Sequence, residues 1–364
     1  MSTEDSVGGP RASAGELGEA LWKAVIDGDE YDAVDVVRGA LAEGLQEEDL
    51  LLDVVAAVQA RIGLEWAADR ITVAQEHAAT AINERVITAL AYHGSGTRPE
   101  TVRGRVTVSC VDGEWHAFPA RLVAETLRLR GWQVDYLGAQ TPTPHLVAHQ
   151  HHTDSDAVLL SGSIPTHLPR AHTAITACRS VGVPVVAGGR AFGVDGRYAR
   201  ALGADAWAPD ARGAAAVLEA GLARPTNVRQ PVDDLPHLAD QEYNMVAQSR
   251  GRLVKETLTE LERRFPPMRE YGDAQRERTA EDLAHVVDFL ATALYVDAVE
   301  VFTEFLGWTA DVLSARNVPP HSLVTGLDIL SDRLHDFPRA LSLVRAGAAH
   351  LTDRTDPAVT DTVV

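Results

Sequence analysis

The middle third of the chain alternates short runs rich in β-branched residues with helix-like segments. The five runs, all between residues 103 and 222, are RVTVSC, WQVDYLG, DAVLLSGS, VPVVAGG and DAWAPD. Because parallel strands need helical crossover connections, this alternation predicts a parallel, doubly wound sheet. Ligands of such sheets bind at the carboxyl ends of the strands. We therefore expect the residues that directly follow these runs to form a binding site.

Helix-like sequence lies on both sides of this region. Residues 14–95 carry apolar residues at three- and four-residue spacing, which predicts a bundle of about four helices. Residues 238–352 show the same spacing and predict a second all-α domain. Three prolines within residues 223–237 are typical of a linker. The polar ends, 1–13 and 353–364, are expected to be a disordered lead and a frayed tail.

Charge and composition exclude several classes of function. With a formal net charge of −19 the chain lacks the excess of basic residues that nucleic-acid binding needs, so we expect no direct contact with nucleic acid. No apolar run is long enough to span a membrane, and the first residues lack the basic and apolar parts of a signal peptide. The two cysteines, Cys110 and Cys178, are predicted to be buried and unpaired, which fits the cytoplasm. No separate catalytic domain is visible, so the chain is not expected to be an enzyme.

Polar and small residues follow three of the predicted strands. The first strand is followed by DGEWHAFP, which contains His116, the third ends in Ser161-Gly162-Ser163, and the fourth ends in Gly188-Gly189. Glycines let a backbone approach a bulky group closely. A neutral imidazole binds transition metals, and its other nitrogen is usually held by a carboxylate. Glu114 and Asp112 are both near enough in sequence to hold His116; a surface histidine is the alternative.

These strand ends resemble the cobalamin-binding domain. The resemblance covers residues 103–222 and rests on the series Glu114-x-His116-x-x-Pro119, Leu137-Gly138, Ser161 and Gly188-Gly189. It implies a flavodoxin-like fold in which His116 is the lower axial ligand of cobalt and Glu114 hydrogen-bonds that histidine. It also implies a slot for the nucleotide tail, lined by Ser161, Ser163, Gly188 and Gly189. Pro119 replaces the usual glycine, and proline suits the first turn of a helix.

The helical region before this domain contains Trp66, followed by Glu76 and His77. If these residues lie on one helix, the spacing is near three turns and places Trp66 and His77 on one face. Core packing of the tryptophan and a solvated Glu-His pair are the alternatives. Next to a cobalamin domain, the pattern Trp-x9-Glu-His resembles the CarH-type light sensors. The resemblance implies that Trp66 covers the adenosyl group of adenosylcobalamin, that Glu76 hydrogen-bonds it and that His77 lies nearby. Ala67 stands where those sensors have the histidine that ligates cobalt after illumination.

The C-terminal helices contain aromatic residues suited to an apolar pocket for a flat chromophore; a dimerisation bundle is the alternative. The order of bundle, cobalamin domain and globin-like helical domain resembles the photocobilins, bacterial photoreceptors that carry adenosylcobalamin and biliverdin. This resemblance implies biliverdin contacts at His285, Tyr295 and Trp308. No cysteine follows Cys178, so the bilin is expected to be bound non-covalently.

Together these resemblances imply a light sensor. In such a sensor, loss of the adenosyl group removes the contacts that hold the bundle against the sheet domain, and so favours a different conformation. We expect a homo-oligomer, with a dimer as its first candidate form, whose assembly depends on light, and a downstream effector protein. One alternative is a corrinoid carrier for methyl transfer with the same ligation by His116; such a carrier must expose the upper face of cobalamin to its partner. The other alternative is a module that senses cobalamin without photochemistry.

Overall fold

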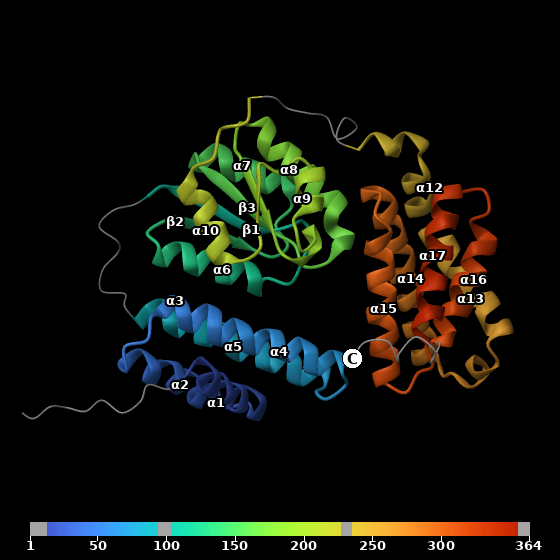
Figure 1. The fold of residues 1–364 in the computed structure, drawn as a ribbon, viewed down its shortest axis with the longest axis horizontal. Coiled ribbons are helices and arrows are strands. Elements are labelled where there is room, and N and C mark those ends of the chain that lie inside the picture. Colours follow the sequence, from blue (N-terminus) through green and yellow to red (C-terminus); the bar gives the residue numbers. More distant parts are fainter. Residues whose placement is uncertain (1–12, 94–102, 227–234, 356–364) are drawn as a thin grey trace, which may run out of the picture.

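The computed structural model describes residues 13–93, 103–226 and 235–355. The predicted disordered lead before residue 13, residues 227–234 of the predicted linker and the tail after residue 355 lie outside the described residues. The described part forms an N-terminal helical bundle, a central parallel sheet with helices on both faces, and a C-terminal helical domain (Figure 1). The predicted fold class is confirmed.

The N-terminal bundle begins with a strongly capped helix. Ser13 and Glu16 form a reciprocal capping box, and Gly28 ends the helix in the left-handed conformation with φ of 78°. The helix that follows the second loop changes to a π-helical turn before it continues as an α-helix. The elements are α1 (Ala14–Asp27), α2 (Glu30–Ala42), α3 (Glu47–Asp49), η1 (Leu50–Val55), α4 (Ala56–Ala67) and α5 (Val73–His93).

The central sheet has five parallel strands in the order β2-β1-β3-β4-β5, which is the flavodoxin-like order. Successive residues of a strand point to opposite faces: Leu159 packs with α6 and α10, while Val158 and Leu160 pack with α7 and α8. The strands are β1 (Arg105–Cys110), β2 (Gln133–Gly138), β3 (Ala157–Ser161), β4 (Val185–Gly188) and β5 (Ala206–Ala208). The connecting elements are α6 (Phe118–Leu129), α7 (Thr143–Thr153), η2 (Pro165–His167), α8 (Leu168–Ser180), η3 (Arg190–Phe192), α9 (Arg197–Ala201) and α10 (Ala211–Ala220).

The C-terminal domain is all-α within the described residues. Its longest helix, α14, supplies a nearly continuous buried face in its second half, from Leu283 to Val296. The elements are η4 (Pro236–Asp240), α12 (Glu242–Gln248), α13 (Arg250–Arg264), η5 (Pro266–Glu270), α14 (Asp273–Val296), α15 (Val299–Ala315), α16 (His321–Arg333) and α17 (Pro338–Thr355). No helix in the described ranges is both long and apolar enough to cross a membrane.

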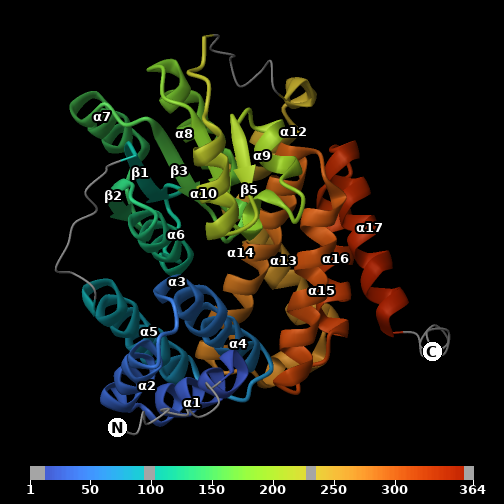
Figure 2. The same cartoon turned by 60° about the vertical axis from the view of Figure 1, so that its left-hand side comes forward.

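The three parts are joined in different ways. One apolar core runs from the α8 face of the sheet into the C-terminal domain and includes Leu160 and Phe302. The bundle has an apolar core of its own, which takes in Phe118 from the first turn of α6. The bundle also contacts the C-terminal domain, because α4 lies against α15 (Figure 2). The bundle is therefore the part that shares least apolar core with the rest of the molecule.

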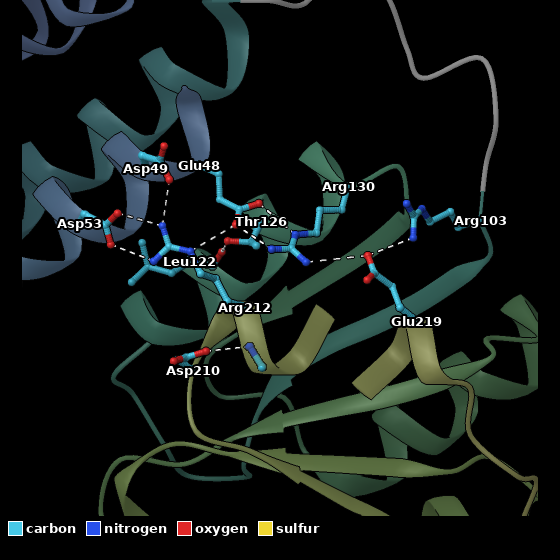
Figure 3. Close-up of polar contacts among 11 residues, drawn as sticks. Glu48, Asp49, Asp53, Arg103, Leu122, Thr126, Arg130, Asp210, Arg212 and Glu219 are labelled. Carbon is cyan, nitrogen blue, oxygen red and sulfur yellow. Dashed lines mark hydrogen bonds and ion pairs between the residues drawn. The ribbon is translucent and has the colours of Figure 1, made fainter. Parts of the chain in front are cut away.

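Ion pairs join α3 and η1, the start of the helix that continues as α4, to the sheet domain (Figure 3). Arg212 of α10 bonds both carboxylate oxygens of Asp53, at 2.8 and 2.9 Å, and Asp49 at 3.0 Å. Arg130 bonds Glu48 at 2.9 and 2.8 Å. The hydrogen bond from Arg130 lowers the pKa of Glu48, and that from Arg212 lowers the pKa of Asp53, in each case against the effect of burial. These carboxylates are therefore charged at neutral pH when the bundle is docked.

Candidate functional site

The loop between β1 and α6 carries a buried carboxylate and a histidine in direct contact. Gly113, with φ of 85°, turns the chain so that Glu114 points inward and is fully buried. One oxygen of Glu114 lies 2.6 Å from Nδ1 of His116 and accepts the backbone N–H of His116 at 3.0 Å. The other oxygen accepts the backbone N–H groups of Ser163 and Ile164 at 2.8 and 3.0 Å. Glu114 thus joins the loop after β1 to the loop after β3.

The surroundings of Glu114 keep it ionised. Burial raises its pKa, but the hydrogen bonds from the His116 ring and from three backbone N–H groups outweigh burial and lower the pKa to about 2. A carboxylate on Nδ1 orients the imidazole and leaves Nε2 for a metal ion. The His116 side chain is 34% exposed, so it is reachable from outside the protein. The second candidate, Asp112, accepts the backbone N–H of Thr143 at 3.4 Å, so Glu114 is the partner of His116.

The predicted glycine pair lies at the same edge of the sheet. Ser161 at the end of β3 is paired in register with Gly188 at the end of β4, and Gly189 follows with φ of 97°. A Cβ atom on Gly189 would lie 2.3 Å from the carbonyl oxygen of Gly162, so only glycine fits. Ser161 is buried, whereas Ser163 is half-buried. The structure therefore brings Ser161, Ser163 and the glycine pair together with Glu114 at one edge.

This donor set fits cobalamin held through a histidine. The edge offers an imidazole whose Nδ1 is engaged, a carboxylate held by four hydrogen bonds and a close-packed glycine turn. Imidazole nitrogen is a suitable donor for a transition metal such as cobalt. Cobalt would be held by His116, supported by Glu114.

Trp66, Glu76 and His77 do not lie on one helix, so the prediction of a shared helix face is wrong. α4 ends at Ala67, the chain turns at Asp69 with φ of 57°, and α5 begins at Val73. Left-handed backbone at a non-glycine residue is uncommon, and local spacing does not reveal it.

A hydrogen-bonded chain ties Glu76 back to α4. Thr80 donates to Glu76 at 3.1 Å, and Gln59 of α4 donates to Thr80 at 2.8 Å. Glu76 also bonds Nδ1 of its neighbour His77, whose side chain is 62% exposed. Glu76 is therefore held in place, while most of the His77 ring faces outward.

The structure shows the contacts of two aromatic residues that motif reasoning left unassigned. Trp115 stacks on His116, with ring centres 3.9 Å apart, and Phe118 enters the core of the bundle. Both residues flank His116 within the same segment of sequence. The aromatic character of both residues indicates that each packs against something, but the spacing of apolar residues does not show which neighbour each one contacts.

Trp66 meets the C-terminal domain. Its ring centre lies 6.3 Å from that of Trp308, and Arg316 donates hydrogen bonds to the carbonyl oxygens of Trp66 and Ala67 at 3.2 and 3.3 Å. No feature of the sequence singled out Arg316. The end of α4 is thus enclosed by a domain that begins well over a hundred residues later.

The three residues predicted to contact biliverdin are not brought together. His285 is exposed on α14, whereas Tyr295, on the same helix, is buried and its hydroxyl lies 2.9 Å from Nδ1 of His172 on α8. At about 1.5 Å of rise per residue the two positions on α14 are about 15 Å apart. Trp308, 47% exposed, lies beside Trp66. Biliverdin binding by these residues stays a prediction.

Two family comparisons match this architecture. A B12 binding domain family matches residues 104–218, and a second B12 binding domain family matches residues 17–91. The first range contains the Glu114–His116 pair and the second contains Trp66. Among curated proteins, none matches the chain.

Solved structures show weak likeness. The monomethylamine corrinoid protein of Methanosarcina barkeri is 21% identical over 57% of this chain and 98% of that chain, with a TM-score of 0.47. A cobalamin-binding protein from Desulfitobacterium hafniense DCB-2 is 19% identical over 56% and 97%, with a TM-score of 0.31. The methanol:cobalamin methyltransferase complex of Methanosarcina barkeri is 18% identical over 61% and 89%, with a TM-score of 0.31. At these TM-scores the likeness does not bear on function. On the two domain matches and the Glu114–His116 geometry, this chain is a cobalamin-binding protein.

Proposed function

We propose that this protein is a light sensor that binds adenosylcobalamin, with His116 as the lower axial ligand and the bundle as a cap over the adenosyl group. The cofactor supplies a cobalt–carbon bond that visible light breaks. The residues of the chain hold the cofactor and respond to the loss of its upper group. Glu114 keeps the His116 ring oriented through the 2.6 Å contact with Nδ1. Ser161, Ser163 and the glycine pair, which lie at the same edge, would line the slot for the nucleotide tail.

The enclosure of Trp66 is the observation that carries this proposal. Trp66 is half-buried at the end of α4, between the bundle and the C-terminal domain, and Arg316 bonds the carbonyl oxygens of this last turn. A carrier for methyl transfer must open its upper face to a partner enzyme. A cap held from two domains favours a protein that retains its ligand and changes shape when the ligand is lost.

The separate core of the bundle supports displacement as the response. The bundle keeps its own apolar core, and it joins the sheet domain through Phe118 and through ion pairs such as Arg212–Asp53. Ion pairs at a surface are weak, so a few lost contacts at the cap can shift the equilibrium between docked and undocked bundle. We propose that the undocked state differs in dimer assembly and is recognised by a downstream effector protein.

Illumination of the reconstituted protein tests this function. Because the cobalt–carbon bond breaks in light with or without a protein, the decisive readout is the protein itself. Protein loaded with adenosylcobalamin in darkness should change its absorption spectrum and its elution volume under green light. Protein loaded with hydroxocobalamin is the control and should show neither change. An elution volume that is the same in dark and light would exclude the sensor.

A second experiment separates the light sensor from the methyl carrier. Replacement of Trp66 by alanine should weaken binding of adenosylcobalamin more than binding of methylcobalamin if Trp66 covers the adenosyl group. A carrier with an open upper face should show the same loss for both cobalamins. Binding constants from spectral titration of both forms decide between the two functions.

We propose biliverdin as a second, non-covalent chromophore of the C-terminal domain. The support is a row of aromatic rings on α14 and α15: Phe289 and Phe305 stack at 3.8 Å, and Trp308 lies 6.5 Å from Phe305. Flat apolar ligands suit such rings. Co-expression with a heme oxygenase should give a protein that absorbs red light and releases the pigment on denaturation. A protein with the cobalamin spectrum alone would rule out the second chromophore.

A further inference from the structure

One arginine of the C-terminal domain binds the end of α4, the bundle helix that carries Trp66. Arg316 directly follows α15, and its guanidinium donates to the carbonyl oxygens of Ala67 and Trp66 at 3.3 and 3.2 Å. The same group lies 5.2 Å from the centre of the Trp66 ring and 3.7 Å from the carboxylate of Asp69. Carbonyl groups in the last turn of a helix accept donors from outside, and a cation there is favoured by the helix dipole. Arg316 therefore makes backbone, aromatic and ionic contacts with one turn.

Trp308 contacts the same turn from the same helix. Trp308 lies in α15, and Arg316 follows eight positions later, directly after the last residue of that helix. The Trp66 and Trp308 rings are tilted by 31° with centres 6.3 Å apart. Tilted aromatic pairs at this distance are attractive. The second half of α15 and the residue that follows it thus contact both the ring of Trp66 and the backbone beside it.

The C-terminal domain also contacts α8, the helix that follows the loop after β3. Tyr295 of α14 lies 2.9 Å from Nδ1 of His172, which is fully buried on α8. The residues shortly before α8, Ser163 and Ile164, donate to Glu114. The apolar core that joins the sheet and the C-terminal domain keeps these parts together. A movement of α4 relative to the sheet domain must therefore break the contacts of Arg316 and Trp308.

We infer that the C-terminal helical domain responds to the position of the bundle, which we call its receiver role. The contacts of Arg316 and Trp308 with the end of α4 couple this domain to the presence of a large group on the upper face of cobalamin. This inference rests on the proposed role of Trp66 as the cover of that group. Its physical basis is that α15 is held by the shared core while α4 belongs to the separate core of the bundle. The ligand state at Trp66 and the state of α15 are then coupled through contacts that exist in the docked arrangement only.

Hydrogen exchange of the protein without cobalamin tests whether Arg316 holds the end of α4; we call this set of contacts the clamp. Replacement of Arg316 by methionine keeps length but removes the donors and the charge, so amides of residues 65–70 should exchange about tenfold faster, as expected for lost charged hydrogen bonds. Arg354→Met is the matched control, because Arg354 bonds Asp311 of the same α15 at 2.6 Å without a contact in α4 that the structure records. Equal exchange of residues 65–70 in both variants and wild type would overturn the clamp.

Exchange with two cobalamins in darkness tests the coupling. Wild-type protein loaded with adenosylcobalamin should differ from protein loaded with hydroxocobalamin at residues 64–80 and also at residues 308–318. In Arg316→Met the difference at 64–80 should remain, and the difference at 308–318 should become clearly smaller, because only the contact between Trp66 and Trp308 is left. A full response at 308–318 in Arg316→Met overturns the receiver role.

A failure of the proposed function can be told apart from a failure of the contact between Arg316 and α4. If wild-type residues 64–80 exchange alike with both cobalamins, Trp66 does not cover the adenosyl group and both the proposed cap and the receiver role are refuted. The exchange of cobalamin-free protein still decides whether Arg316 holds α4. Arg316→Lys, which keeps the charge but lacks the planar fork, should fall between wild type and Arg316→Met in that measurement.

Discussion

At the scale of single residues, Glu114 determines what His116 can do. Four hydrogen bonds converge on a carboxylate with no exposure to solvent, and they hold its pKa at about 2. Two of these bonds come from His116 itself and two come from the loop after β3. One side chain therefore both orients the imidazole and joins two strand ends.

Glu114→Gln should weaken cobalamin binding while Asp112→Asn leaves it nearly unchanged. A glutamine has one acceptor oxygen and no charge, so it cannot satisfy the ring and both loops. Loss of a supporting partner of this kind typically costs about 10- to 100-fold in metal affinity. Spectral titration with hydroxocobalamin at neutral pH measures the affinity, and thermal unfolding of the cobalamin-free variants checks that they fold. Equal affinities for the two variants would show that Glu114 does not support the ligand.

At the scale of elements, the continuous helix from α3 to α4 is held at both ends by arginines of other domains. Arg130 and Arg212 of the sheet domain bond its first residues, and Arg316 of the C-terminal domain bonds its last turn. A π-helical turn, η1, lies between these ends. Such turns occur often at functional sites, where the helix departs from regular hydrogen bonding. The helix is therefore a bridge between two domains that share a core with each other.

Acid should weaken the docking of the bundle. The pKa values of Glu48 and Asp53 are lowered in the docked state, by hydrogen bonds from Arg130 and Arg212 respectively. Stabilisation from a lowered pKa is complete above the unfolded values, about 4.3 for Glu and 3.9 for Asp, and is lost as pH falls through the lowered values. Small-angle scattering between pH 6 and pH 3 should show expansion, and 0.5 M NaCl should shift its onset upward.

Arg212→Met provides the matched variant for that titration. It should remove about 1 kcal/mol of docking free energy at neutral pH and make the dependence on pH shallower. Arg264→Met is the control, since Arg264 bonds Glu260 and Asp332 within the C-terminal domain. A scattering titration that is identical for Arg212→Met and wild type would refute the role of this ion pair.

At the scale of the whole molecule, the C-terminal domain and the sheet domain share one apolar core. Their apolar residues form one cluster, and a polar contact crosses the interface where Tyr295 meets His172. Tyr243 and Tyr295 also pack edge to face, with ring centres 4.7 Å apart. Because a buried polar group must keep its hydrogen bonds, this contact makes the relative position of the two domains specific.

Tyr295→Phe should lower the free energy of unfolding by about 1–3 kcal/mol, because it removes a partner from a buried histidine. The measurement is chemical denaturation of the protein without cobalamin. Thr257→Val is the control: the Thr257 hydroxyl is buried and has no hydrogen-bond partner among the described residues, so its loss should be neutral or stabilising. Equal destabilisation by the two substitutions would mean that the Tyr295 contact is not specific.

Local pattern was enough to predict the sheet and the position of His116 at its edge. The alternation of strand and helix segments determines a parallel sheet because crossovers allow few arrangements, and Glu114 and His116 meet because they are two positions apart in one loop. Spacing alone does not show whether Asp112 or Glu114 holds the His116 ring. The choice depends on which carboxylate also meets the loop after β3, nearly fifty positions away.

Only the tertiary structure decided how the cap is arranged. Trp66 and Glu76 lie on separate helices because the chain turns at Asp69, a left-handed residue that no periodicity marks. Arg316 bonds Trp66 across 250 positions of sequence. Contacts of this kind depend on how finished domain surfaces pack, whereas periodicity records only which face of each element is apolar. The sequence by itself therefore determined the parallel sheet and the position of His116 at its edge, and the packing of the helical parts decided that α4 ends against α15.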